Sequence, residues 1–160
     1  MGIQQRVLPV FFATVVVIMA GVALADPQTE PIGMGVANRG DLSTDVWVPV
    51  SYLESGKAYF LSVGVSGRQV SVFLLKDRQG YYHAAFNACQ SCFREGKGYR
   101  QEGDFMVCNN CGKAFASVQI GEMHGGCNPA PLPMKMEGQY LVVSREDIVS
   151  GTRLFPSRGY

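Results

Sequence analysis

The sequence predicts a small, mainly antiparallel β domain with a short C-terminal helix, preceded by one N-terminal apolar helix. From residue 56 onward, short runs of β-branched and aromatic residues alternate with turn residues. The 160 residues include 19 glycines and 8 prolines, which is consistent with turn-rich β structure. The length suits one domain with one core.

The N-terminal segment carries a single arginine, Arg6, and then no charge from Val7 to Ala25. Its last residues, Ala23-Leu24-Ala25, have the small-x-small pattern of a cleavage site. Residues 1–25 are therefore predicted to be a signal peptide or a retained membrane anchor, with membrane association through 7–25. Both alternatives place the domain in the cell envelope, either periplasmic or anchored to the inner membrane outside the cytoplasm.

The charge balance excludes several classes of partner. Lys and Arg number 14 against 13 Asp and Glu, which gives a net charge of +1. No basic excess points to nucleic acid, and we expect none as a partner. Hydrophobic residues make up 47% of the chain, so the chain is not a disordered one.

The exported part begins with a lead-in or linker over 26–55, and a four-cysteine β domain follows over 56–156. Within the lead-in, Val46–Val50 is apolar, but its proline confines it to an edge strand or a lead-in strand. Ser144 is a predicted helix N-cap and Gly151 the end of that helix. The predicted strands of the domain are 59–65, 70–75, 81–86, the two sides of a hairpin over 98–107, and 139–143.

The five cysteines lie in a pattern typical of metal sites. Cys89/Cys92 and Cys108/Cys111 are both C-x-x-C pairs, and a predicted hairpin separates them. Two cysteines three residues apart on a tight turn can aim both sulfur atoms at one point. Four such thiolates can bind zinc or an iron–sulfur cluster. Cys127 is a candidate fifth or alternative ligand.

Other interpretations of the same residues stay open. The cysteines could form disulfides in an oxidising compartment, or one pair could exchange thiols. His124 could ligate a metal, and the methionines could bind copper(I). His83 is expected to be a half-buried strand residue. No His/Asn or His/Asp arrangement accompanies the cysteines, so a redox carrier is favoured over an enzyme.

In its loop order, the cysteine region resembles Rieske-type cluster domains, with a glycine- and proline-rich segment after the second loop. Cysteine stands where those domains have histidine, so a Rieske centre with two histidines on one iron is excluded by residue type. A zinc ribbon is the other fold-level resemblance. The implied architecture is a Rieske-like β domain whose loops are of the rubredoxin-knuckle type.

A closer resemblance covers roughly Val46 to Phe155 and is to the FtrD-like membrane iron–sulfur-containing proteins. It rests on the segments 84–92, 97–104, 107–112, 125–132 and 146–151. The resemblance implies an iron–sulfur cluster as cofactor and a link to ferrous-iron uptake. It also implies a membrane iron permease or another envelope redox protein as partner.

These observations favour an exported metal–thiolate protein that transfers electrons in support of iron uptake or envelope redox metabolism. Its expected ligands are Cys89, Cys92, Cys108 and Cys111. The alternatives are a structural zinc domain that binds a membrane partner, and an envelope copper or iron chaperone that uses Cys127, His124 and the methionines. Zinc is the alternative metal.

Overall fold

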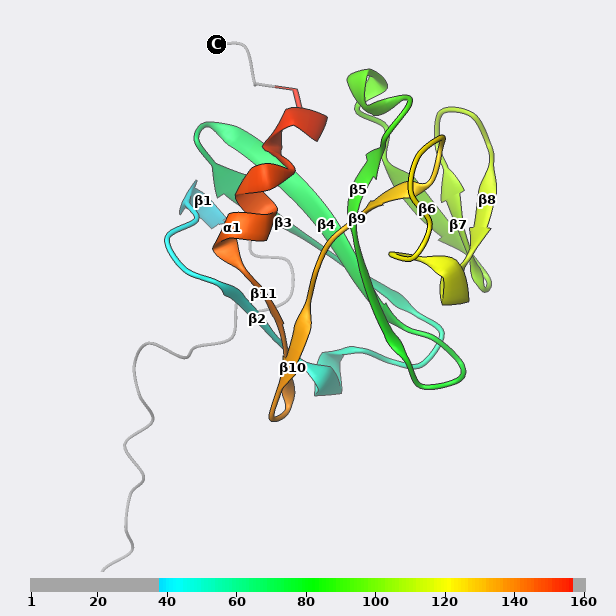
Figure 1. Cartoon of the computed structure of the whole chain (residues 1–160), viewed down its shortest axis with the longest axis horizontal. Helices are drawn as coiled ribbons and strands as arrows, with labels where there is room; N and C mark the ends of the chain where they lie inside the picture. The colour runs from blue at the N-terminus through cyan, green and yellow to red at the C-terminus, as the bar shows by residue number, and fades with distance from the viewer. Residues whose placement is uncertain (1–37, 157–160) are drawn as a thin grey trace, which may run out of the picture.

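The computed structural model describes residues 38–156, and these are mainly antiparallel β with one short C-terminal helix, as predicted. Figure 1 shows the elements in chain order. The strands are β1 Asn38–Asp41, β2 Val46–Pro49, β3 Ala58–Val65, β4 Arg68–Lys76, β5 Tyr82–Cys89, β6 Tyr99–Glu102, β7 Phe105–Cys108, β8 Ala114–Ala116, β9 Pro129–Pro131, β10 Lys135–Glu137 and β11 Tyr140–Val143. The helices are α1 Arg145–Ser150 and the 3-10 turns η1 Val50–Tyr52, η2 Phe93–Glu95, η3 Ser117–Gln119 and η4 Thr152–Leu154.

The described strands form three sheets. The largest has the order β1-β3-β4-β5-β9, and only its β1–β3 pairing is parallel. The second has the order β10-β11-β2, and the third, β6-β7-β8, lies beside the β5–β9 edge of the largest sheet (Figure 1). The third sheet is the hairpin between the two C-x-x-C pairs, extended by one strand.

Strand β4 separates two hydrophobic cores because successive side chains of a strand point to opposite faces. Val72 and Leu74 belong to the core that α1 and the β2–β11 pair cover. Phe73 and Leu75 belong to a second core under the third sheet. Their relative exposures are at most 1%, so both faces of this strand are dry. Cys89 and Cys108 belong to this second core, and Cys92 and Cys127 pack against it.

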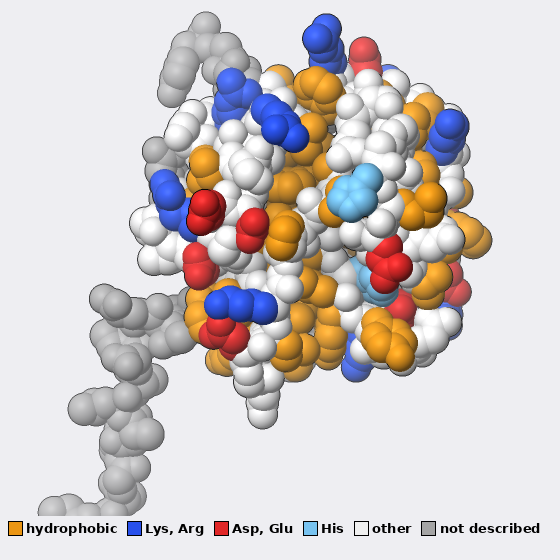
Figure 2. Space-filling view, in the orientation of Figure 1, with side chains coloured by type: hydrophobic (Ala, Val, Ile, Leu, Met, Phe, Trp, Pro, Cys, Tyr) orange, Lys and Arg blue, Asp and Glu red, His pale blue; other side chains and the backbone are white. Residues whose placement is uncertain are grey.

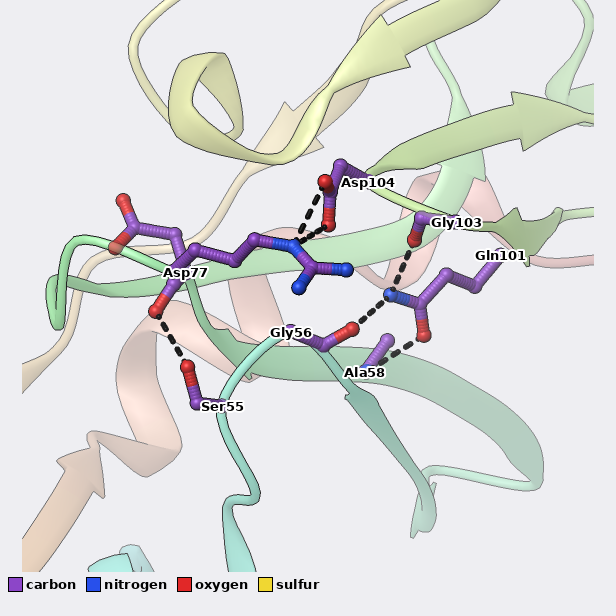
Figure 3. Close-up of polar contacts among 8 residues, drawn as sticks. Ser55, Gly56, Ala58, Asp77, Gln101, Gly103 and Asp104 are labelled. Carbon is purple, nitrogen blue, oxygen red and sulfur yellow. Dashed lines mark hydrogen bonds and ion pairs between the residues drawn. The ribbon is translucent and has the colours of Figure 1, made fainter.

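Gln101 on β6 fastens the cysteine-bearing hairpin to the largest sheet. Its side-chain oxygen accepts a hydrogen bond from the Ala58 N–H at 2.8 Å, and its nitrogen donates to the carbonyl of Gly56 at 2.7 Å (Figure 3). At the hairpin turn, Arg78 Nε donates to both carboxylate oxygens of Asp104, at 2.6 and 2.8 Å. The Gln101 hydrogen bonds hold the third sheet against the largest sheet, and the exposed Arg78–Asp104 pair adds little.

The C-terminal helix begins and ends where the sequence predicts. The Ser144 hydroxyl accepts from the Asp147 N–H at 3.0 Å, which is an N-cap hydrogen bond. Gly151 is the C-cap. Beyond it, Arg68 of β4 donates to the Phe155 carbonyl at 2.7 Å and ties the end of the domain to the sheet.

Several elements differ from their predicted limits. The predicted strand 81–86 runs on to Cys89 as β5. Residues 26–55, the predicted lead-in, include β1 and β2, and β2 is an edge strand as its proline requires. The short strands β8, β9 and β10 have too few residues for a recognisable pattern. The predicted N-terminal apolar helix lies outside the described residues.

Charged side chains occur in small groups on the surface. Figure 2 shows lysine, arginine and acidic side chains interspersed on one face, around a band of hydrophobic side chains. This distribution agrees with the near-zero net charge of the sequence.

Candidate metal centre

The first C-x-x-C pair sits at the end of strand β5. Cys89 is the last residue of that strand and lies on the same strand face as Ala85, four residues earlier. Its side chain therefore points into the second core, where it is 3% exposed. The chain then turns, and the Cys92 N–H donates to the Cys89 sulfur at 3.2 Å. The two Sγ atoms are 2.9 Å apart. An amide N–H directed at a sulfur stabilises its thiolate form.

The second pair closes strand β7 in a similar way. Cys108 is the last residue of β7 and is 1% exposed. Gly112, at φ 72°, donates its N–H to the Cys108 carbonyl at 2.9 Å and closes the turn that carries Cys111. Cys111 itself is exposed. The Cys92 and Cys108 Sγ atoms are 3.8 Å apart, so the turns of the two pairs meet.

Cys127 reaches the same place because strand β9 pairs with β5. Pro129 is the register partner of Cys89, which brings Cys127, two residues earlier, beside the first pair. The Tyr99 hydroxyl donates to the Cys127 carbonyl at 2.6 Å. The Ser91 hydroxyl donates to the Gly126 carbonyl at 2.7 Å. The loop that carries the fifth cysteine is therefore held by both the first turn and strand β6.

The supporting role of Asn87 was missed at the sequence level. Asn87 accepts the Tyr99 N–H at 2.7 Å and donates to the Ser71 hydroxyl at 3.2 Å, which joins β5 to β6 just before Cys89. A Cβ on Gly98 would lie 2.6 Å from the Asn87 Oδ1, so the glycine permits this close approach. The sequence could have identified Asn87, because it is a polar residue two positions before a cysteine and therefore lies on the same face of the strand.

The thiols shift one another's pKa values. Hydrogen bonding to Cys89 and then burial raise the pKa of Cys92. Burial would raise the pKa of Cys89, but hydrogen bonds from the Cys92 side chain and backbone outweigh it and lower that pKa. The Lys113 backbone N–H, and then Cys127, lower the pKa of Cys111 to about 7. Hydrogen bonding to Cys111, and then burial, raise the pKa of Cys127 to about 11.

The remaining candidate residues lie apart from the thiols. His124 is exposed, and among the described residues it joins no group of potential metal ligands. Met123 and Met136 are about half exposed, while Met134 packs against the first core. His83 is in a strand as expected but is buried rather than half-buried, at 8% exposure, because it pairs with Asp77.

All five cysteines are free and together offer only sulfur donors. They form two groups within which all Sγ atoms lie within 4.8 Å of one another: Cys89, Cys92 and Cys127; and Cys92, Cys108 and Cys111. No histidine or carboxylate of the described residues joins either group. Thiolate-only donor sets suit zinc and iron–sulfur clusters, so the residues present fit the cofactor that the resemblance implies.

Fold and site define a small β domain whose cysteines could hold a metal. The family description "Membrane iron-sulfur containing protein FtrD-like" matches residues 53–155, and the chain belongs to this family. A comparison with curated proteins gives no match. Within residues 38–156, no helix is long and apolar enough to cross a membrane.

Proposed function

We propose that this protein is a metal–thiolate electron carrier of the cell envelope that supports iron uptake. The observation that carries the proposal is the convergence of two C-x-x-C turns, with the Cys92 and Cys108 sulfurs 3.8 Å apart. The family, described as iron–sulfur-containing, supports iron as the metal. A cluster held by cysteine thiolates supplies one-electron oxidation and reduction when bound. The proposed ligands are Cys89, Cys92, Cys108 and Cys111, with Cys127 as a further candidate.

The protein's own groups suit this role in two ways. Cys89 and Cys108 are buried among Phe73, Tyr99 and Met106, which exclude water from one side of the site. Cys111 is exposed on the other side. A redox partner could therefore approach the site from the Cys111 side while the buried side holds the ligands rigidly.

A backbone N–H favours the thiolate form of Cys89, and a side-chain contact holds the second turn. The Cys92 N–H is directed at the Cys89 sulfur, and such hydrogen bonds set the potential of a cluster. Lys97 donates to the Asn110 side chain at 3.0 Å, which places an exposed cation beside the second turn. This hydrogen bond ties the second turn to the loop before β6.

Location and partner form part of the proposal. The family description names a membrane protein, and the apolar segment 7–25 is the proposed means of export or anchoring. The domain would then face the envelope, where a membrane iron permease or another redox protein exchanges electrons with it.

Elemental analysis and visible spectroscopy of the full chain test the proposal. The protein is isolated anaerobically from its native envelope, so that its own export route has supplied the metal. Iron and acid-labile sulfide, with absorption bands that bleach reversibly on dithionite reduction, are expected. Cys108→Ser should abolish the bands, whereas His124→Ala, a change in an exposed loop, should retain them.

The alternative outcomes are distinct. Zinc with no visible bands would contradict electron transfer and make the domain a structural zinc module, whose unfolding on chelation is then the property to measure. Loss of metal in His124→Ala would favour an exchangeable site of the chaperone type. A metal content unchanged in Cys108→Ser would remove that residue from the ligand set.

A further inference from the structure

The five thiols are divided in space in a way that the two C-x-x-C motifs do not suggest. The described cysteines form two groups of three, rather than one group of four or five within the same 4.8 Å limit. Cys92 is the one member common to both. Its sulfur is 2.9 Å from that of Cys89 and 3.8 Å from that of Cys108, so it stands between the two strand ends.

Within each group, the sulfur atoms lie close enough together to approach one metal ion. A metal–sulfur bond is about 2.3 Å long, so two thiolates on one tetrahedral ion lie about 3.8 Å apart. The Cys92–Cys108 separation has this value. The Cys89–Cys92 separation is smaller, and these two sulfurs would move apart by less than an ångström to reach it.

The division follows from the fold. Cys127 is placed beside Cys89 by the β9–β5 pairing, whereas Cys111 follows Cys108 at the end of β7 in a different sheet. Cys92 lies in the turn between these two sheets, after β5 and before β6. The two outer pairs are thus held by separate backbones, and Cys92 is the cysteine that belongs to both groups.

We infer that the centre has two metal positions that share the Cys92 thiolate. One position is bounded by Cys89, Cys92 and Cys127, and the other by Cys92, Cys108 and Cys111. The inference rests on the proposed metal–thiolate function and deepens it by giving the number of metal atoms. It makes Cys127 a ligand of equal standing with Cys111 and makes Cys92 the residue on which both positions depend.

The test counts metal atoms in the full chain isolated anaerobically from the envelope. Two metal atoms per chain are expected in the wild type, with iron, zinc and acid-labile sulfide measured in the same sample. Cys127→Ser and Cys111→Ser should each lower the count to about one. Cys92→Ser should lower it to near zero, and Met123→Leu, in the exposed loop before Cys127, should leave it at two.

A titration of the metal-free wild-type chain with Co²⁺ keeps the test independent of variant folding. Thiolate-to-cobalt absorption should rise to a break at two equivalents. A break at one equivalent, four irons in the native protein, or full metal retention in Cys127→Ser would each overturn the shared-thiolate centre. Four irons with four sulfides would leave the proposed electron-transfer function standing. A colourless two-zinc protein would support the shared centre and contradict that function.

Discussion

The carboxylate of Asp77 and the ring of His83 form a buried pair, with Oδ2 and Nε2 2.9 Å apart. The other ring nitrogen, Nδ1, lies 2.9 Å from the carbonyl oxygen of Ile120. Both ring nitrogens thus face oxygen atoms. Asp77 also accepts the Tyr81 N–H at 2.9 Å. The pair joins the end of β4 to β5 and to the segment that leads toward Cys127.

Replacing Asp77 by Asn is expected to destabilise the fold in a pH-dependent way. Burial would raise the pKa of Asp77, but hydrogen bonds from His83 and the Tyr81 N–H outweigh it and lower that pKa. Because the folded-state pKa is below the unfolded value of about 4, the stabilisation is present above about pH 4. It is lost as the pH falls through the lowered pKa. Urea midpoints of both proteins from pH 6 to pH 2 measure this.

The matched control is Asp104→Asn, which removes a carboxylate whose side chain is 49% exposed. Its effect on the urea midpoint should be small at every pH, because exposed ion pairs contribute little. An Asp77→Asn difference that stays the same at pH 6 and pH 2.5 would show that the carboxylate's charge is irrelevant to stability.

Gly151→Ala is expected to strain the core at the end of α1. A Cβ at this position would lie 2.2 Å from two atoms of the Phe86 ring, and Phe86 is only 4% exposed. Gly151 has φ −85°, so backbone conformation is not the obstacle. Overpacking of this kind costs about 1–3 kcal/mol, measurable as a lower urea midpoint.

A double variant separates steric strain from other effects of the glycine replacement. Phe86→Leu removes part of the ring volume that the new methyl group meets. Gly151→Ala should therefore cost less in the Phe86→Leu background than in the wild type, which is a favourable coupling between contacting residues. Strictly additive effects would contradict the clash as the cause.

Asn87→Ala is expected to loosen the two halves of the cysteine site. It leaves the Tyr99 N–H without the oxygen that accepts it at 2.7 Å, and such an unpaired group costs about 1–3 kcal/mol when buried. The affinity for Zn²⁺, measured by competition with a coloured chelator, should fall as well. Ser71→Ala keeps the Asn87–Tyr99 hydrogen bond and should cost less, so equal losses in both variants would contradict this role.

In the reduced, metal-free chain, Cys111 is expected to be the thiol that iodoacetamide alkylates first. Its pKa is lowered to about 7 and its side chain is exposed, whereas Cys89 is buried. The thiolate is the reactive form, so the rate should rise through pH 7 and level off by about pH 8. Peptide mass spectrometry follows each site. Cys127→Ser weakens one cause of the lowered pKa and should move the Cys111 profile to higher pH.

Local patterns predicted much of the secondary structure. Runs of β-branched and aromatic residues in 59–65 and 70–75 predicted β3 and β4, and the Ser144 cap with Gly151 predicted the limits of α1. These features depend on neighbours in the sequence, so the sequence displays them directly. The local sequence did not predict the extension of β5 to Cys89, because the strands that pair with β5, β4 and β9, come from distant parts of the chain.

For the site, the sequence by itself determined the donor atoms. Five thiols and two C-x-x-C turns favour metals that prefer sulfur ligands. The three-residue spacing lets the two sulfur atoms of each pair approach the same point. The sequence also determined that the pairs are separated by a hairpin.

Only the tertiary structure decided how the thiols are grouped. Whether Cys127 meets Cys89 or remains apart depends on the register of β9 against β5, a pairing between residues about 40 apart in the chain. The burial of His83 depends likewise on Asp77 and Ile120 arriving from other elements. Such contacts arise from packing between strands that no local pattern encodes, because each face of β5 could have faced either core.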